Sequence, residues 1–140
     1  MRGYFFSELD HRAIVRVRAT GPIKTLDLTF EIDTGASEQL FIGGELAEEL
    51  GLKLDKEQTA TLANGSEVIV FQAKLQIEWL DGAYEVDATV WPINPDKPRG
   101  RRSKNKPDGL IGQALLLQSH LSIDYVNRKV VLTKPVIEGA

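Results

Sequence analysis

Asp33 is the residue whose setting most favours chemistry, because it directly follows an alternating, strand-like segment that ends at Ile32. A carboxylate held at the end of a strand can take a proton from water and act as a general base. Four small residues come after it: Thr34, Gly35, Ala36 and Ser37. An Asp in this position can also make a simple Asx-turn, so an ordinary loop is the alternative interpretation.

A second motif, DGLIG, begins at Asp108 and leads into sequence typical of a short helix. It contains two bulky aliphatic residues and a glycine: Leu110, Ile111 and Gly112. FEIDTGAS and DGLIGQALL together resemble the motifs of the single-domain, retropepsin-like aspartic proteases, which occur in retroviruses and in prokaryotes. The order of elements agrees with that family from about Ala13 to Thr133.

The resemblance implies a role for each residue of the two motifs. Asp33 is the expected catalytic acid, and Thr34 is expected to hydrogen-bond across a two-fold axis. Gly35 and Ala36 keep the loop small enough for substrate to come close, and Ser37 completes it. Leu110, Ile111 and Gly112 are expected to pack beneath the loop and fix its shape.

The resemblance also implies a flap, which is a hairpin that opens and closes over the cleft. The candidate is the segment at about 59–71, with Ala63, Asn64 and Gly65 at its tip. Asn-Gly is a strong signal for a two-residue hairpin turn, because both positions tolerate positive φ. An ordinary hairpin within the sheet is the alternative.

Peptide hydrolysis without a metal or a covalent intermediate needs a base to activate water and an acid to protonate the departing group. Two carboxylates that share one proton supply both. The chain has one Asp-Thr-Gly; Asp108 and Asp124 are other candidates, but neither precedes Thr-Gly. We therefore expect a homodimer that joins two copies of Asp33, acts on a peptide or protein substrate, and uses no metal or cofactor.

The chain departs from many retroviral relatives at two positions, where their ion pair is replaced by Ser37 and Gln113. Because both partners have changed together, a neutral hydrogen bond is expected between them. A loop at about 92–107 is also much longer than in a retroviral protease. The chain ends do not obviously form interlocking strands, and Pro135 is tolerable only at a sheet edge.

Composition excludes several other chemistries. The 140 residues contain no cysteine, which excludes disulfides, thiolate metal sites and cysteine nucleophiles. No phosphate-binding loop, dinucleotide fingerprint or HExxH motif occurs, and Ser66 does not lie in a GxSxG motif. His11 and His120 have no ligand-like spacing to each other.

Charge is distributed unevenly along the chain, whose net charge is −3. Six basic residues lie within 97–106, which leaves 11 of 17 basic residues against 20 acidic ones, near −9. A basic loop on an acidic body is not typical of a nucleic-acid-binding protein. No segment is apolar enough for a signal peptide or a membrane span, so we expect a cytoplasmic protein.

Short strands dominate the predicted structure. Alternation over 13–19 and 24–32 predicts an N-terminal hairpin, and further strands are predicted at 39–42, 59–62, 67–71, 73–79 and 84–90. The segments 121–126 and 129–133 are predicted to form a last hairpin. GGELAEELG reads as a short helix that ends at Gly51. The strand pattern predicts one all-β, barrel-like domain spanning 1–140. The resemblance implies that it is a closed barrel-like aspartic protease half-domain with one or two short helices. The alternative function is a non-catalytic dimerisation or peptide-binding module of the same fold.

Overall fold

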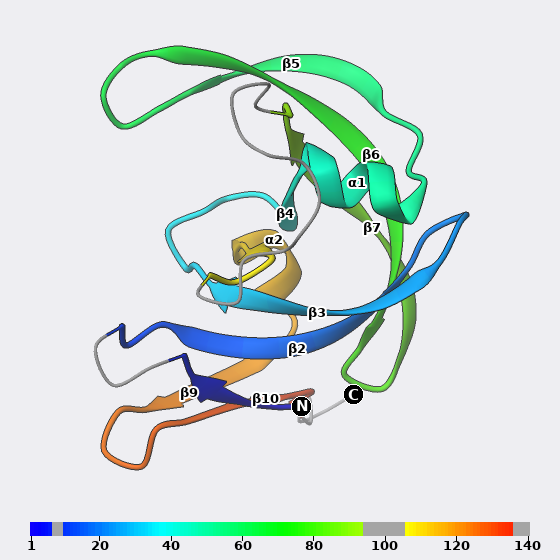
Figure 1. The fold of residues 1–140 in the computed structure, drawn as a ribbon. Coiled ribbons are helices and arrows are strands. Elements are labelled where there is room, and N and C mark those ends of the chain that lie inside the picture. The colour runs from blue at the N-terminus through cyan, green and yellow to red at the C-terminus, as the bar shows by residue number, and fades with distance from the viewer. Residues whose placement is uncertain (7–9, 94–105, 136–140) are drawn as a thin grey trace.

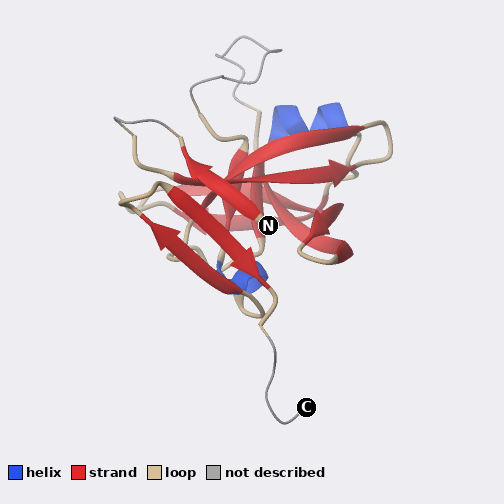
Figure 2. Cartoon of the chain, turned by 90° about the horizontal axis from the view of Figure 1, so that it is seen from below, coloured by secondary structure: helices blue, strands red, loops and turns tan. Residues whose placement is uncertain are grey.

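The computed structural model describes residues 1–6, 10–93 and 106–135. Most of the predicted basic loop therefore lies outside the described residues. Within them the order of elements is β1 (Arg2–Phe5), β2 (Ala13–Thr20), β3 (Thr25–Ile32), β4 (Leu40–Gly43), α1 (Gly44–Leu50), β5 (Asp55–Thr61), β6 (Glu67–Trp79), β7 (Gly82–Trp91), β8 (Gly109–Ile111), α2 (Gln113–Leu116), β9 (His120–Asp124) and β10 (Lys129–Thr133). Strands form nearly all of this framework, and the two helices are short and lie apart (Figures 1 and 2).

Six strands close into a barrel in the order β2–β3–β8–β4–β7–β6, because β6 pairs back onto β2. The closing contact is antiparallel and joins Ala19 to Ile77 and Thr20 to Gln76. The remaining strands extend this barrel: β5 lies beside β6, and β1, β10 and β9 continue outward from β2. The prediction of an all-β, closed barrel-like fold with short helices is confirmed.

The apolar residues of the alternating segments form the core, as predicted. In β2, Val15 and Val17 are fully buried while Arg16 and Arg18 between them are exposed. In β3, Leu28 and Phe30 are also fully buried. Burial of each such large apolar side chain contributes roughly 1.5–3 kcal/mol, so β3, the strand that leads to Asp33, is anchored in the core.

The helix predicted after β4 is confirmed as α1, and it ends as expected. Gly51 adopts a left-handed conformation with φ of 77°, and its backbone N–H bonds to the carbonyl groups of Ala47 and Glu48. None of the helices in the described part of the chain has the length and apolar character that crossing a membrane requires.

One strand prediction needs correction, and one strand was not predicted. The sequence suggested separate strands at 67–71 and 73–79, whereas β6 runs unbroken through both. The buried positions Val70 and Ala73 are three residues apart, which breaks the two-residue period although the backbone stays extended. β1 was not predicted, because its four residues have little alternation and gain their order by pairing with β2 and β10.

Candidate active site

Asp33 lies where three strands meet. β8 runs between β3 and β4, parallel to the first and antiparallel to the second, and Ile111 pairs with both Ile32 and Leu40. The backbone N–H of Asp33 donates to the carbonyl oxygen of Ile111 at 2.9 Å. Ile111 is fully buried and Leu110 is half-buried. The second motif thus fixes the point at which the chain leaves β3 and presents the Asp33 carboxylate.

A tight turn holds the Asp33 side chain. Its Oδ1 atom accepts a hydrogen bond of 3.0 Å from the Gly35 backbone N–H. The Ala36 N–H donates to the Asp33 carbonyl oxygen at 3.2 Å. Asp33 and Ala36 are half-buried, whereas Thr34, Gly35 and Ser37 are exposed. The carboxylate is therefore oriented by backbone and remains accessible to solvent.

Hydrogen bonds from the start of α2 hold the far side of this loop. The backbone N–H of Gln113 donates to the Ala36 carbonyl at 2.7 Å, and that of Ala114 donates to the Glu38 carbonyl at 3.3 Å. The Gln113 side-chain amide, through Nε2, donates to the Thr34 carbonyl oxygen. A neutral contact thus stands where retroviral relatives have an ion pair, but its partner is the Thr34 carbonyl and not the Ser37 side chain that the sequence suggested.

Gly112 allows the loop and β8 to come this close. A Cβ at this position would lie 2.1 Å from the Glu38 carbonyl oxygen, and the Gly112 N–H donates to the Gln39 carbonyl at 3.0 Å. Gly35 is different, since a Cβ there would meet only the Asp33 Oδ1 atom, at 3.4 Å. Packing within one chain requires glycine at position 112 but not at position 35.

The other two candidate acids serve local structure. Asp108 accepts hydrogen bonds through Oδ2 from the Thr29 backbone N–H at 2.8 Å and the Thr29 hydroxyl at 3.1 Å. These bonds lock the start of β8 to β3. Asp124 accepts from the backbone N–H groups of Val126 and Asn127, each at 3.0 Å, and so shapes the β9–β10 turn. Both acids therefore have structural roles.

Glu31 is a titratable neighbour of Asp33 that was not identified from the sequence. It lies on β3 two residues before Asp33 and is half-buried. Burial raises the pKa of Glu31 above its usual value; the Arg12 guanidinium opposes this shift, and the charges of Asp33 and Asp10 add to it. The period of β3 places residues 31 and 33 on the same side of the strand, so this neighbour could have been identified from the sequence.

The expected flap is the hairpin of β5 and β6, whose tip points to the same side of the molecule as the Asp33 loop in Figure 1. The turn spans 62–66 and is closed by a 2.8 Å bond from the Leu62 N–H to the Ser66 carbonyl. Only Gly65 in this turn has positive φ, 84°, so the predicted two-residue Asn-Gly turn is wrong. Asn64 instead accepts hydrogen bonds from the Ser66 N–H and hydroxyl.

A family model described as aspartyl protease matches residues 15–115. The chain belongs to the aspartyl protease family. Among solved structures it is similar to the EIAV protease complexed with the inhibitor HBY-793, with a TM-score of 0.53 and 15% identity over 79% of this chain and 90% of that chain. At this identity the likeness shows the fold, which is that of a retroviral protease. No curated protein matches the chain.

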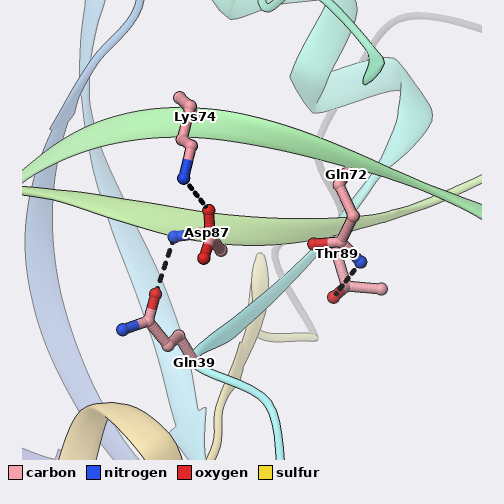
Figure 3. Close-up of polar contacts among 5 residues, drawn as sticks. All are labelled: Gln39, Gln72, Lys74, Asp87 and Thr89. Carbon is pink, nitrogen blue, oxygen red and sulfur yellow. Dashed lines mark hydrogen bonds and ion pairs between the residues drawn. The ribbon is translucent and has the colours of Figure 1, made fainter. Parts of the chain in front are cut away.

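This member of the family has a cavity of about 420 Å³ beside the Asp33 loop. Its walls come from Glu38 and Gln39 of the loop, from the base of the β5–β6 hairpin, from β7 and from Ala114. Figure 3 shows two of its polar contacts: the Asp87 N–H donates to Gln39 Oε1 at 2.7 Å, and Gln72 Nε2 donates to Thr89 Oγ1 at 3.1 Å.

The lining of this cavity was not identified from the sequence. Lys74 and Asp87 form an ion pair across β6 and β7, next to the Gln39 contact (Figure 3). Thr89 is buried although it shares the polar side of β7 with Asp87. Only the strand registers bring these residues together, and a buried hydroxyl in an alternating strand is too weak a signal to predict a site.

Proposed function

We propose that the chain is a homodimeric aspartic endopeptidase in which two copies of Asp33 activate a water molecule for attack on a peptide bond. The observation that carries this proposal is the construction of the Asp33 loop. Its carboxylate is oriented by the Gly35 N–H, its base is anchored by Ile111, and its far side is bound by Gln113. A simple Asx-turn needs the first of these contacts but not the other two.

The two carboxylates divide the chemistry between them. Like charges in contact do not both ionise, so the pair holds one proton. The ionised carboxylate takes a proton from water, whose oxygen adds to the peptide carbonyl carbon. The protonated carboxyl polarises the carbonyl oxygen and then supplies the proton that the departing amine needs. The C–N bond breaks without a covalent enzyme intermediate.

The surroundings of Asp33 suit a peptide substrate. The exposed backbone of Thr34 and Gly35 allows close approach. The cavity beside Glu38 and Gln39 has room for a substrate side chain. Leu62 and Ile69, near the tip of the flap hairpin, are 37% and 49% exposed and offer apolar contact to a bound chain. Closure of the hairpin would then exclude water from the reacting bond.

The test is cleavage of a diverse peptide library by the wild-type protein and by Asp33→Asn, from mildly acidic to neutral pH. We expect the wild-type protein to cleave peptides. The Asp33→Asn substitution should abolish cleavage while circular dichroism and the dimer seen by sedimentation stay unchanged. Asp108→Asn is the matched control, because this acid serves structure. Cleavage by Asp33→Asn at the wild-type rate would remove Asp33 from the mechanism. A well-folded dimer that cleaves nothing would favour the binding-module alternative.

A further inference from the structure

Three amide side chains line the cavity beside the Asp33 loop. Gln39 comes from the end of the loop, Gln58 from β5 and Gln72 from β6. The apolar residues among the described lining are two alanines, Ala73 and Ala114, whereas pockets that receive apolar groups are lined mostly by large hydrophobic and aromatic side chains. The cavity is therefore suited to a polar side chain, and the hydrogen bonds of the three amides indicate which one.

The amide of Gln39 retains a hydrogen-bond donor. Its Oε1 atom accepts from the Asp87 backbone N–H at 2.7 Å. Because a backbone N–H can only donate, this contact fixes which atom of the amide faces Asp87. The Gln39 Nε2 atom points away from Asp87 in Figure 3 and has no hydrogen-bond partner among the described residues. It can therefore donate to a bound side chain.

The amides of Gln72 and Gln58 together offer one more donor and one acceptor. Gln72 Nε2 donates to Thr89 Oγ1 at 3.1 Å and to Gln58 Oε1 at 3.2 Å. Gln72 Oε1 and Gln58 Nε2 then have no partner within the part of the chain that the structure describes. The reverse orientation of both amides would leave a donor on Gln72 and an acceptor on Gln58. In either orientation the pair offers both kinds of group.

A carboxamide is the side-chain group that complements these atoms. It carries an accepting oxygen and a donating NH₂ group on the same carbon, so it can accept from Gln39 Nε2 and donate to Gln72 Oε1. A carboxylate only accepts and would repel Gln72 Oε1, whereas an ammonium only donates and would leave Gln39 Nε2 unpaired. An apolar side chain would displace water from all of these atoms without replacing its hydrogen bonds, which is unfavourable.

The charged residues around the cavity do not favour an ionised side chain of either sign. Lys74 and Asp87 neutralise each other in an ion pair (Figure 3). The other charged residues of the described lining are Glu38, Asp55 and Lys56, and all three are exposed. Solvent and salt screen exposed charges. Selection in this cavity therefore depends on the amide hydrogen bonds more than on charge.

We propose that this cavity is a substrate subsite that selects a glutamine or asparagine side chain through Gln39, Gln58 and Gln72. This inference rests on the proposed function and specifies its substrate class, which is peptides with a carboxamide side chain near the scissile bond. The cavity adjoins the loop at Glu38 and Gln39, beyond the turn that holds the Asp33 carboxylate. The carboxamide therefore belongs to a residue on one side of the bond that is cleaved.

The first test compares peptides that differ at one residue. In a peptide that the wild-type protein cleaves, each position flanking the scissile bond is occupied in turn by Gln, Asn, Glu, Leu or Lys, and kcat/KM is measured. At one position we expect Gln or Asn to give a kcat/KM at least about tenfold above that of Glu, which has nearly the shape of Gln, and above that of Leu. The ratio of two values from one preparation does not depend on how much protein is folded.

A single substitution should change the preference. Gln39→Glu keeps an oxygen for the Asp87 N–H but replaces the free donor with an accepting, negatively charged oxygen. The ratio of kcat/KM for the Gln peptide to that for the Lys peptide should fall at least about tenfold. Gln76→Glu is the matched control, because Gln76 is exposed, lies on the same face of β6 as Gln72, and is not part of the described lining. A purely structural role of Gln39 would change both rates together and leave their ratio unaltered.

The outcomes separate this proposal from the proposed function. If the wild-type protein cleaves Gln, Glu and Leu peptides equally well, or if Gln39→Glu keeps the wild-type ratio, the subsite is wrong and the shared Asp33 pair stands. If no peptide is cleaved, the proposed function fails, and binding then decides the subsite. Alanine-based peptides that contain one Gln, Glu or Leu are titrated into the Asp33→Asn protein and followed by NMR. Binding of the Gln peptide at least about tenfold tighter than the others supports the subsite, and equal affinities refute it.

Discussion

Replacement of Gly112 by Ala tests whether the second motif fixes the Asp33 loop. A Cβ at this position would lie 2.1 Å from the Glu38 carbonyl oxygen and 2.9 Å from that of Ala36. Non-bonded atoms normally stay about 3.5–4.0 Å apart. The backbone between Ala36 and Glu38 must therefore move by about 1 Å or more, and it cannot do so while keeping its bonds to Gln113 and Ala114.

The size of the effect follows from this displacement. Overpacking of a tightly packed site costs typically about 1–3 kcal/mol. For a domain of this size, roughly 3 °C of unfolding temperature corresponds to each kcal/mol, so Gly112→Ala should unfold about 3–9 °C below the wild-type protein. A misplacement of about 1 Å at the reacting groups can cost about 100-fold in rate, so cleavage should fall by roughly that factor.

Gly35→Ala provides the contrast that makes this prediction specific. A Cβ at Gly35 meets only the Asp33 carboxylate, at 3.4 Å, so the fold of one chain should tolerate it. Substrate and a second copy are expected to approach this exposed residue closely. Gly35→Ala should therefore unfold at nearly the wild-type temperature and yet lose roughly tenfold or more in activity. Gly82→Ala is the control for both, because its Cβ would find no atom nearer than 3.7 Å.

Differential scanning calorimetry and the rate of cleavage of one peptide, measured on the same preparations, give both readouts. Unfolding of Gly112→Ala at the wild-type temperature would refute the claim that this glycine is required by packing. Full activity of Gly35→Ala would refute the claim that its exposed surface receives the substrate or the partner copy.

Three further predictions follow from the groups around the loop. Because the pKa of Glu31 is raised in the folded state, the protein loses stability as pH rises through that pKa. Glu31→Gln should therefore raise the unfolding temperature at neutral pH. It should not do so in acid, where the Glu31 side chain is protonated and as neutral as the glutamine that replaces it. Asp108→Ala leaves the Thr29 N–H without its carboxylate acceptor and should cost about 1–3 kcal/mol in chemical denaturation; an unchanged midpoint would contradict this. If the Asp33 pair acts with one proton, the pH–rate profile should be bell-shaped with its maximum on the acid side of neutrality, whereas a rate that climbs into alkaline pH would indicate another catalyst.

The sequence predicted those parts of the site that depend on short segments. Alternation predicted β2 and β3, and Gly51 predicted the end of α1, because the period of a strand and the left-handed conformation of glycine are local properties. The motifs around Asp33 and Ile111 predicted the loop and the strand beneath it. Each of these predictions uses residues that are neighbours in the chain.

The remaining contacts of the site depend on which distant strands become neighbours and in what register they pair. Gln39 and Asp87 are 48 residues apart and meet only because β4 lies parallel to β7. Gln113 was expected to bond to Ser37, but the turn from Asp33 to Ala36 directs the Thr34 carbonyl toward it. β1 has a weak strand signal and owes its order to two neighbours. Single-sequence periodicity carries no information about such pairings, since it does not specify which strands become adjacent.

Packing within one chain accounts for most residues of the two motifs but not for every residue of the Asp33 loop. Packing within the chain explains Gly112, Ile111 and Asp108, each of which is held by hydrogen bonds or close approaches. It gives no reason for a residue as small as Gly35 at this exposed position. In the proposed mechanism the Asp33 carboxylate is half of a proton-sharing pair. The proposed homodimer brings a second copy against the Asp33 loop, and this approach explains why a small, exposed residue follows Thr34 in the loop.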